Sequence, residues 1–424
     1  MIDKVKPQET SEVRRKATLA KVAAKQLALL TTAQKNEALE AMATALIVNE
    51  LEIIDANQLD LARGKENGIS ESLLDRLALN SARIAAMAEG LRQLIDLPDP
   101  IGEVLEQIDR PNGLHIKKVA VPLGVIGMIY EARPNVTVDA AGLSFKTGNA
   151  VVLRGGSAAI DSCQAIVNVL HRALASLGLP VDAIQFIADP RRSSVDEMLK
   201  LNGLLDVLIP RGGASLIQNV VQNATVPVIE TGAGICHTFI DASADLEMAL
   251  AIAVNAKAQR PSVCNAMETL LVHAEFAKQH LPAIASAMGA KSVELRGCEQ
   301  TIALLPNVHE ATEQDFATEY NDYILNIRVV ATLDEALDHI ARYGTLHSEC
   351  IVTNDEHNAR RFLQEVDAAA VYHNASTRFT DGFEFGFGAE IGISTQKLHA
   401  RGPMGLPALT SVKYNIYGHG QVRG

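Results

Sequence analysis

The sequence has no long apolar run, no excess of basic residues and no clustered cysteines. No apolar stretch reaches the ~18 residues that a membrane-spanning helix requires. Residues 12–30 are mixed in charge and helical in pattern, unlike an apolar signal core. The formal net charge of -12 argues against a general affinity for nucleic acid or acidic membranes. We therefore expect a cytoplasmic protein in which local arginines and backbone amides hold any anionic ligand.

Cysteine pairs and metal-ligand spacings are also missing. No C-x-x-C pair and no Cys/His spacing typical of zinc sites occurs, so the sequence predicts neither a disulfide framework nor a bound metal. Two of the five cysteines fall in apolar stretches typical of a core, and a third lies in a polar loop. The other two have surroundings shaped by glycine or proline. Cys163 and Cys350 are the two in apolar stretches, and Cys298 is the one in the polar loop. Cys236 and Cys264 are the two beside glycine or proline.

The composition is typical of a globular enzyme. The chain has 424 residues, of which 48% are hydrophobic and 21% charged, enough for two or three domains. Residues 1–95 follow the spacing of successive amphipathic helices, with breaks expected at Gly64, Gly68 and Gly90.

Two short segments around a turn predict a β-hairpin. Residues 104–108 and 114–121 flank the turn Pro111-Asn112-Gly113. This hairpin and a strand expected at 410–417 would leave open sheet edges, which proteins usually cover. We expect both to be contacts in a homo-oligomer, either a dimer or a tetramer.

From residue 124 onward, apolar runs of strand length alternate with helical segments. Such alternation is typical of parallel sheets covered by helices on both faces, which bind ligands beyond the carboxyl ends of their strands. We therefore predict an α/β fold with two series of strands. They are expected at 124–130, 150–153, 184–187, 205–209 and 226–229, and then at 269–273, 323–330, 348–353 and 369–372.

Two of these strands end in an arginine followed by a glycine pair that opens a helix. Arg154 precedes Gly155-Gly156-Ser157, and Arg211 precedes Gly212-Gly213. Glycines let the backbone approach a phosphate, the helix N-terminus supplies free amides, and arginine adds a bidentate fork. Neither stretch is a G-x-G-x-x-G fingerprint, and one glycine pair alone is usually a tight turn. Two such strand ends favour a dinucleotide site.

The first of these strand ends also bears on cofactor choice. An acidic residue there would hydrogen-bond a free ribose and repel a 2′-phosphate. Arg154 is basic and Ser157 is small and polar. We therefore predict a preference for NADPH over NADH.

One cysteine stands between a rigid turn and a strand. Cys264 follows Arg260-Pro261 and precedes the strand expected at 269–273. A thiol at the mouth of a strand, with a fixed cation nearby, can act as a low-pKa nucleophile. The alternative is the more common role of a free cysteine, a small buried hydrophobe.

Three further side chains at predicted strand ends are candidates for chemistry. Asn135 is placed as an amide donor to an oxyanion and Arg133 as an anion anchor. Asparagine is also a leading helix N-cap residue, which is the alternative role for Asn135. Glu230 follows the strand at 226–229, where the alternative is a surface carboxylate before a turn.

In this order along the chain, four stretches resemble the aldehyde dehydrogenase superfamily: residues 122–137, 148–156, 259–268 and 399–406. Within it, the chain is similar to the branch that reduces L-glutamyl 5-phosphate in proline biosynthesis. The resemblance implies two parallel-sheet α/β domains and a small β region for oligomerisation. The implied dinucleotide-binding domain covers 1–103 and 122–232, the catalytic domain 233–395, and the oligomerisation hairpin and tail 104–121 and 396–424.

The resemblance also implies roles for single residues. Cys264 matches the nucleophile, and Asn135 the residue whose amide forms the oxyanion hole with the backbone N–H of the cysteine. Arg154 stands where many relatives have a lysine that contacts the adenosine ribose. Glu319 resembles the glutamate that contacts the nicotinamide ribose, and Glu230 matches the general base of relatives that oxidise aldehydes.

Two departures from the oxidising relatives indicate acyl-phosphate chemistry. Those relatives have Glu-Leu-Gly-Gly-Lys where this chain has Glu230-Thr231-Gly232-Ala233-Gly234, and no hydrolytic base is needed when the acyl group arrives from phosphate. The second departure is Arg260, which is close to Cys264 in the sequence and suits a phosphorylated substrate better than a plain aldehyde. The leaving phosphate is expected to bind Arg133 or Arg260. The implied reaction is the NADPH-dependent reduction of L-glutamyl 5-phosphate to L-glutamate 5-semialdehyde, through a thioester on Cys264.

Alternatives to this reaction stay open. One is the oxidation of a simple aldehyde with Glu230 as base, and another is a dinucleotide-binding scaffold without chemistry. The chain has no room for a kinase domain, so the acyl phosphate is expected from a separate glutamate 5-kinase. An association with that kinase is a hypothesis.

Overall fold

The structure, a computed structural model, describes residues 11–423. Residues 1–10 and 424, where the predicted first domain begins and the predicted tail ends, lie outside the described residues. The chain forms two compact units. The first comprises the described residues up to Glu230, Phe387–Gly392 and those from Met404 onward, and the second comprises Thr231–Gly386 and Ile393–Pro403.

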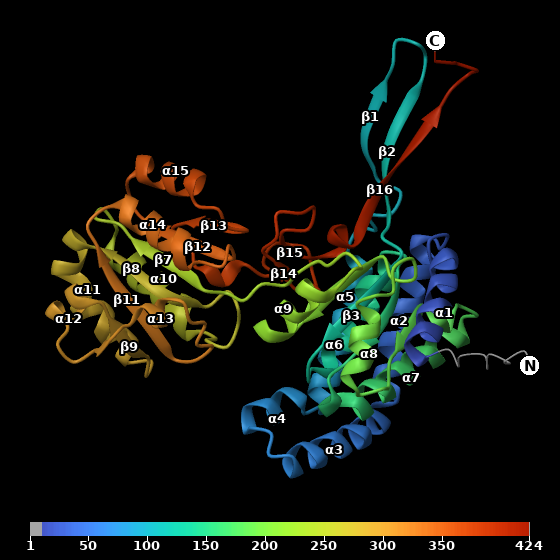
Figure 1. The fold of residues 1–424 in the computed structure, drawn as a ribbon, viewed down its shortest axis with the longest axis horizontal. Helices are drawn as coiled ribbons and strands as arrows, with labels where there is room; N and C mark the ends of the chain where they lie inside the picture. The colour runs from blue at the N-terminus through green and yellow to red at the C-terminus, as the bar shows by residue number, and fades with distance from the viewer. Residues whose placement is uncertain (1–10, 424) are drawn as a thin grey trace, which may run out of the picture. The chain divides into compact units, whose positions relative to one another are not determined.

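The first unit begins with five helices: α1 (Glu12–Leu27), α2 (Thr32–Val48), α3 (Glu50–Glu66), α4 (Glu71–Leu77) and α5 (Ser81–Asp96) (Figure 1). The predicted break at Gly68 is confirmed, since this residue follows α3 with a φ of 68°. The breaks predicted at Gly64 and Gly90 are wrong, because both residues lie inside helices. At Gly64 an added Cβ would lie 2.9 Å from Leu74 Cδ2, so this glycine lets α3 pack closely on α4.

Four parallel strands form the sheet of the first unit, in the order β5-β4-β3-β6. β3 and β4 are fully buried, as expected of a parallel sheet with covered faces. Because β3 lies between β4 and β6, the carboxyl ends of these three strands are neighbours. The strands are β3 (Val125–Tyr130), β4 (Ala150–Arg154), β5 (Ile184–Phe186) and β6 (Val207–Arg211). The accompanying helices are α6 (Pro134–Lys146), η1 (Ser157–Ala159), α7 (Ile160–Ser176), η2 (Val181–Ala183), α8 (Arg192–Met198) and α9 (Ala214–Asn223).

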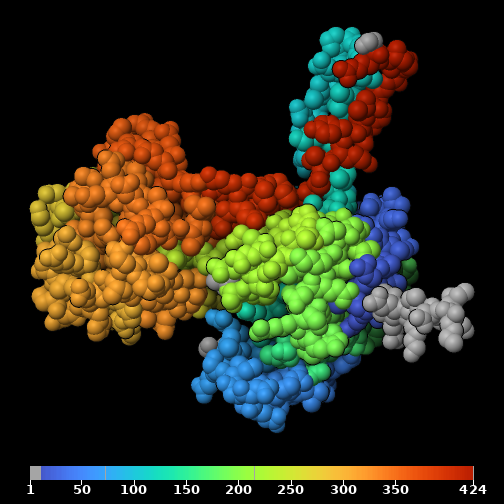
Figure 2. Space-filling model, viewed as in Figure 1, coloured from blue at the N-terminus to red at the C-terminus, as the bar shows by residue number. Residues whose placement is uncertain are grey.

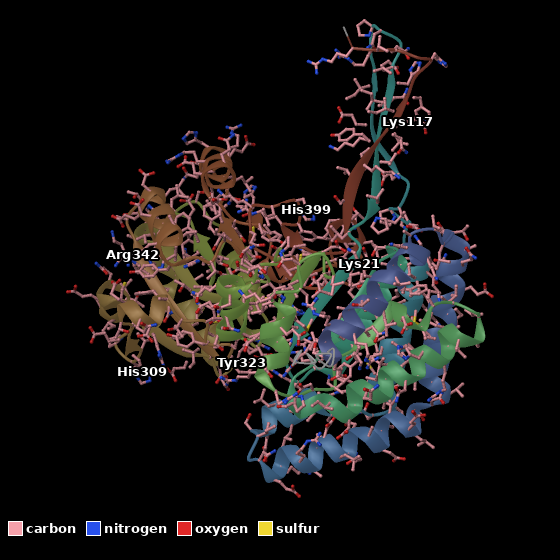
Figure 3. The ribbon with its side chains drawn as sticks, turned by 45° about the vertical axis from the view of Figure 1, so that its right-hand side comes forward. Lys21, Lys117, His309, Tyr323, Arg342 and His399 are labelled. Carbon is pink, nitrogen blue, oxygen red and sulfur yellow. The ribbon has the colours of Figure 1, made fainter. Side chains whose placement is uncertain are left out.

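An ion pair also joins α1 to the start of β6. Lys21 Nζ lies 2.7 Å from Asp206 Oδ2 (Figure 3). The N–H of Val125, the first residue of β3, donates to the same carboxylate at 2.7 Å. Asp206 therefore links the first helix to two strands of the sheet.

The prediction of a fifth strand in this sheet is wrong. Residues 226–229 form only an isolated parallel bridge between Leu208 and Val228. Pro227 has no N–H to donate, and its carbonyl accepts from the Leu208 N–H at 2.8 Å. The segment runs beside β6 without becoming a regular strand.

The predicted hairpin and terminal strand are confirmed and form one antiparallel sheet, β1-β2-β16. Its strands are β1 (Val104–Asp109), β2 (His115–Pro122) and β16 (Thr410–Tyr417). We call this sheet the arm; Figure 2 shows its visible face uncovered. Gly113 has the positive φ that the turn requires, 86°. Lys117 on β2 lies 5.8 Å from the ring centroid of Tyr417 on β16 (Figure 3).

The second unit contains a seven-stranded parallel sheet of order β10-β9-β11-β8-β7-β12-β13. Its strands are β7 (Cys236–Ile240), β8 (Met267–His273), β9 (Glu294–Gly297), β10 (His309–Glu310), β11 (Ile324–Val330), β12 (Ser348–Val352) and β13 (Ala370–His373). Its helices are α10 (Leu246–Ala258), α11 (Ala274–Gly289), α12 (Glu299–Leu304), α13 (Glu313–Phe316), α14 (Leu333–Tyr343), α15 (Glu356–Glu365) and η3 (Thr377–Phe379). The short pair β14 (Ile393–Ser394) and β15 (Gly402–Pro403) also belongs to this unit, and η4 (Leu406–Leu409) precedes β16 in the first.

Sequence reasoning missed β7, which lies between β8 and β12. Its residues include His237 and Thr238, so the segment is not a continuous apolar run. Both are fully buried, and His237 Nδ1 lies 3.0 Å from Glu349 Oε2 on β12.

Within the described residues, no helix is long and apolar enough to cross a membrane. The same part of the chain contains no group of three or more His, Cys, Asp or Glu side chains that could hold a metal ion.

Candidate active site

Cys264 lies in the loop between α10 and β8, and its side chain is partly exposed. Two neighbouring side chains bind the main chain of this loop. The Cys236 thiol donates to the Cys264 carbonyl at 3.2 Å, and the hydroxyl of Thr377 donates to the carbonyl of Asn265 at 2.8 Å. The nucleophile candidate therefore lies on a braced loop, not in the core.

A glycine packs directly against this loop. A Cβ added at Gly234 would lie 1.5 Å from the Cys264 carbonyl oxygen, so only glycine fits there. The Gly234 N–H donates to Glu319 Oε1 at 2.9 Å. The structure thus brings Glu319, predicted to contact the cofactor, next to the segment that supports Cys264.

A buried ion pair joins the helix and the strand on either side of this loop. Lys257 Nζ on α10 lies 2.7 Å from Glu268 Oε2 on β8, and both side chains are almost completely buried. Burial raises the pKa of Glu268 to about 7, opposed by the Lys257 charge. Glu268 Oε1 also accepts from the Asn321 N–H at 3.2 Å, two residues beyond Glu319. Glu268 lies in a stretch that carried the family resemblance, but no sequence signal indicated this partner.

Asn135 belongs to the first unit, near the start of α6. Arg133 occupies the N-cap and Pro134 the first turn, so the helix-cap role for Asn135 is excluded. Its exposed side chain donates through Nδ2 to Asp139 Oδ2 at 3.2 Å. Burial raises the pKa of Asp139 to about 6, opposed by this hydrogen bond and by the Arg211 charge. Asp139 therefore orients the Asn135 side-chain amide. Cys264 belongs to the second unit.

Both glycine pairs lie beside Glu131, the residue that follows β3. A Cβ added at Gly156 would lie 3.3 Å from the Glu131 carbonyl carbon, and one at Gly212 would lie 2.7 Å from its carboxyl carbon. The Gly213 N–H donates to Glu131 Oε2 at 3.2 Å. The Gly213 N–H at the start of α9 is thus bound by a carboxylate of the protein itself.

Arg154 ends β4 as predicted, but its guanidinium is nearly buried and bound to main-chain carbonyls. Nη1 donates to Gly155 O at 3.0 Å and Nη2 to Pro190 O at 2.8 Å. The side chain thus ties the end of β4 to the segment before α8. Arg191 in that segment is exposed and pairs with Asp189 at 2.7 Å.

The other predicted residues lie as follows. Ser157 begins η1, and Arg211 is the last residue of β6. Arg133 is half-buried and its N–H donates to the Glu131 carbonyl at 2.7 Å. Glu230 is half-buried at the end of the first unit's main segment, and Arg260 is exposed in the second unit.

Comparison with known proteins covers nearly the whole chain. The model of the aldehyde dehydrogenase family matches residues 1–322. A gamma-glutamyl phosphate reductase from Moorella thermoacetica is 62% identical over 412 residues, which cover 97% of this chain and 99% of that protein. The enzyme of the same name from Clostridium novyi is 60% identical over 407 residues, or 96% and 98% of the two chains.

Solved structures agree with the sequence matches. The crystal structure of gamma-glutamyl phosphate reductase from Thermotoga maritima has a TM-score of 0.96 at 50% identity, covering 98% of this chain and 100% of that one. An acetylating aldehyde dehydrogenase from Geobacillus thermoglucosidasius, at 18% identity and a TM-score of 0.70 over 97% and 98% of the two chains, shares the fold. The predicted aldehyde-dehydrogenase-like α/β fold is confirmed, and the chain is an oxidoreductase that needs a nicotinamide cofactor. It belongs to the aldehyde dehydrogenase family, within its group of gamma-glutamyl phosphate reductases.

Proposed function

We propose that this protein catalyses the NADPH-dependent reduction of L-glutamyl 5-phosphate to L-glutamate 5-semialdehyde, with release of phosphate, as a step of proline biosynthesis. The observation that carries the proposal is Cys264. Its side chain is partly exposed on a braced loop, whereas Cys163, Cys236 and Cys350 are buried. The names of the similar enzymes support the substrate. A cytoplasmic location stays a prediction.

In the proposed reaction, the Cys264 thiolate attacks the acyl carbon of the substrate. The C–S bond forms, and the bond from that carbon to the phosphate oxygen breaks, which leaves a thioester. The Asn135 amide and the Cys264 N–H donate to the oxyanion of the tetrahedral intermediate, where such donors lower the barrier. Arg133 or Arg260 binds the leaving phosphate. Bound NADPH would supply a hydride to the thioester carbon, after which the C–S bond breaks and releases L-glutamate 5-semialdehyde and the Cys264 thiolate.

We assign the cofactor to the strand ends of the first unit and to Glu319. The residues that would hold it are Arg154, Gly155, Gly156, Ser157, Arg211, Gly212, Gly213, Glu230 and Glu319. The support is that the glycine pairs open helices at the ends of β4 and β6, and that Arg211 ends β6. The absence of an acidic side chain at Ser157 supports NADPH over NADH.

The deciding experiment runs the reaction backwards. Purified protein, given glutamate 5-semialdehyde and NADP, should form NADPH only when inorganic phosphate is present, because phosphate must release the acyl group from Cys264. Oxidation with Glu230 as a hydrolytic base would proceed equally well without phosphate, and that result would refute the proposal. A kcat/KM with NAD equal to or above that with NADP would refute the cofactor preference.

We also propose that the arm joins subunits in a homo-oligomer. The support is its exposed apolar side chains, among them Tyr414 and Ile416, which are 53% and 60% exposed, and its unpaired edges β1 and β16.

An association with glutamate 5-kinase would protect the labile acyl phosphate in transit. A mixture of the two enzymes should then convert glutamate faster than the sum of the separate steps predicts. If the coupled rate shows no advantage and the proteins do not co-migrate, the association is ruled out.

A further inference from the structure

An arginine that sequence reasoning did not single out spans the Cys264 loop. Arg378, in η3 of the second unit, donates through Nε to Gln259 Oε1 at 2.8 Å and through Nη1 to Asn265 Oδ1. Gln259 directly precedes Arg260, and Asn265 directly follows Cys264. The guanidinium therefore holds both ends of the segment that carries the nucleophile.

The position of Arg378 is fixed by its neighbours. Ser376 Oγ accepts from the Arg378 N–H at 3.3 Å. Asn265 Nδ2 donates to the Thr380 carbonyl at 2.8 Å, and the Thr377 hydroxyl donates to the Asn265 carbonyl at 2.8 Å. A planar guanidinium held in this way is preorganised, so an incoming oxyanion would not have to order it.

Two positive charges interact here, and the effect of Arg260 on the pKa of Arg378 is larger than that of the nearby acidic Asp381. Among the described residues, neither Arg378 nor Arg260 forms an ion pair, and Nη2 of Arg378 donates no hydrogen bond. Burial and the neighbouring Arg260 charge lower the pKa of Arg378, opposed by Asp381 and the thiols of Cys264 and Cys236. Like charges brought together beside a nucleophile are unfavourable until an anion joins them.

We propose that Arg378 and Arg260 form the binding site for the phosphate group of the acyl phosphate, with Arg378 as its fixed member. The inference rests on the proposed function and deepens it, because that function left the phosphate to Arg133 or Arg260. As the acyl carbon–oxygen bond breaks, its electron pair leaves with the phosphate. A fixed guanidinium beside Cys264 stabilises this growing charge.

The kinetic test uses Arg378→Gln and Arg260→Gln, with Arg360→Gln as the control. Arg360 is exposed on α15, 4.0 Å from Glu356. In the phosphate-dependent reverse reaction, each site variant should raise the KM for phosphate at least ~10-fold, because a charge-assisted hydrogen bond is lost. The KM for NADP and all constants of Arg360→Gln should stay within about twofold, the usual scatter for surface substitutions. An unchanged KM for phosphate in Arg378→Gln would overturn the inference.

A second measurement needs no turnover and separates binding from a purely structural role of Arg378. Alkylation at Cys264 is followed by peptide mass spectrometry with anionic iodoacetate and neutral iodoacetamide. In the wild type, phosphate should slow alkylation by both reagents, and Arg378→Gln should lose this protection. Without phosphate, Arg378→Gln should react with iodoacetate more slowly than the wild type does, and its rate with iodoacetamide should fall less. If Arg378→Gln changes the alkylation rates with both reagents equally and phosphate still protects Cys264, Arg378 only braces the loop and the inference fails.

The two measurements also separate this inference from the proposed function. If the wild type reacts without phosphate, the proposed function fails. If it requires phosphate but Arg378→Gln has the same KM for it, only the Arg378 site fails. If turnover fails but phosphate protection of Cys264 still depends on Arg378, the anion site stands without the proposed reaction.

Discussion

At the level of single residues, the reactivity of Cys264 depends on how its loop is held. The Cys236 thiol and the Gly234 backbone contact the Cys264 main chain, and Arg378 spans the loop. These contacts place the thiol at the surface while the peptide units around it stay ordered. Such order matters because small displacements of a reacting group can cost orders of magnitude in rate.

Replacing the proposed nucleophile and its oxyanion donor should have different effects. Cys264→Ala should abolish phosphate-dependent NADP reduction, because the thioester cannot form. Asn135→Ala should lower kcat by ~10²–10³, the usual loss for one oxyanion-hole donor. Steady-state kinetics with both variants checks this. Normal turnover by Cys264→Ala would contradict the covalent scheme.

Gly234→Ala should disturb the Cys264 loop, because the new Cβ would overlap the Cys264 carbonyl oxygen. We expect a loss of about 1–3 kcal/mol in the free energy of unfolding, typical of overpacking, and slower alkylation of Cys264. Urea unfolding and mass spectrometry measure the two effects. The matched control is Gly289→Ala at the end of α11, where an added Cβ meets no atom within 4 Å. Equal behaviour of the two variants would contradict the steric account.

Asp139 should make stability depend on pH. Burial raises its pKa in the folded protein to about 6, above the ordinary value of an aspartate, about 3.9, so the folded state binds the proton more tightly than the unfolded state. Stability from this group is therefore present below about pH 4 and is lost as the pH rises to about 6. Between pH 4 and 7 the wild type should lose about 1–2 kcal/mol relative to Asp139→Asn. Urea unfolding across this range tests it, and parallel pH profiles would contradict it.

At the level of helices and strands, short-range pattern predicted most elements correctly and failed for identifiable reasons. β3, β4 and β8 were predicted because their apolar runs are nearly continuous. β7 was missed because the buried polar residues His237 and Thr238 interrupt its apolar run, and the pairing of His237 Nδ1 with Glu349 on β12 depends on a distant strand. The segment at 226–229 had the apolar pattern but contained Pro227, which cannot donate to a ladder.

The Lys257–Glu268 pair should hold α10 and β8 together around the Cys264 loop. Removing one partner by Lys257→Met or Glu268→Gln should cost about 3–5 kcal/mol, because the other charge stays buried and unpaired. The double variant should lose less than the sum of the single losses. A double-mutant cycle in urea measures the coupling, with the exposed pair Glu275 and Lys278 on α11 as control. Additive losses would show that the pair is not coupled.

At the level of the whole molecule, the arm carries an apolar stripe on alternate residues of β16. Val412, Tyr414 and Ile416 share one face, because side chains on a strand alternate. Lys413 lies on the other face and is also exposed. An uncovered stripe of this kind favours a partner subunit.

Ile416→Lys should therefore weaken the proposed homo-oligomer. Lysine is chosen because it removes the apolar contact and places a charge that an apolar interface would have to desolvate. Light scattering after size-exclusion chromatography should show a lower mass at low micromolar protein, while Lys413→Gln leaves the mass unchanged. A wild type that is monomeric would contradict the proposal directly.

The sequence by itself determined the family, the α/β alternation, the hairpin and terminal strand of the arm, and the cysteine proposed as nucleophile. Apolar spacing, turn residues and local motifs are properties of short segments, so they are visible in the sequence without the tertiary structure. Only the tertiary structure decided which distant side chains meet them. Arg378 stands 113 residues beyond its partner Asn265, and no local pattern indicates that contact. Arg154 carries a local anion-binding signal, yet its guanidinium binds the carbonyls of a segment that follows a different strand. Such pairings depend on chain crossovers and packing, which bring together residues that no sequence window contains.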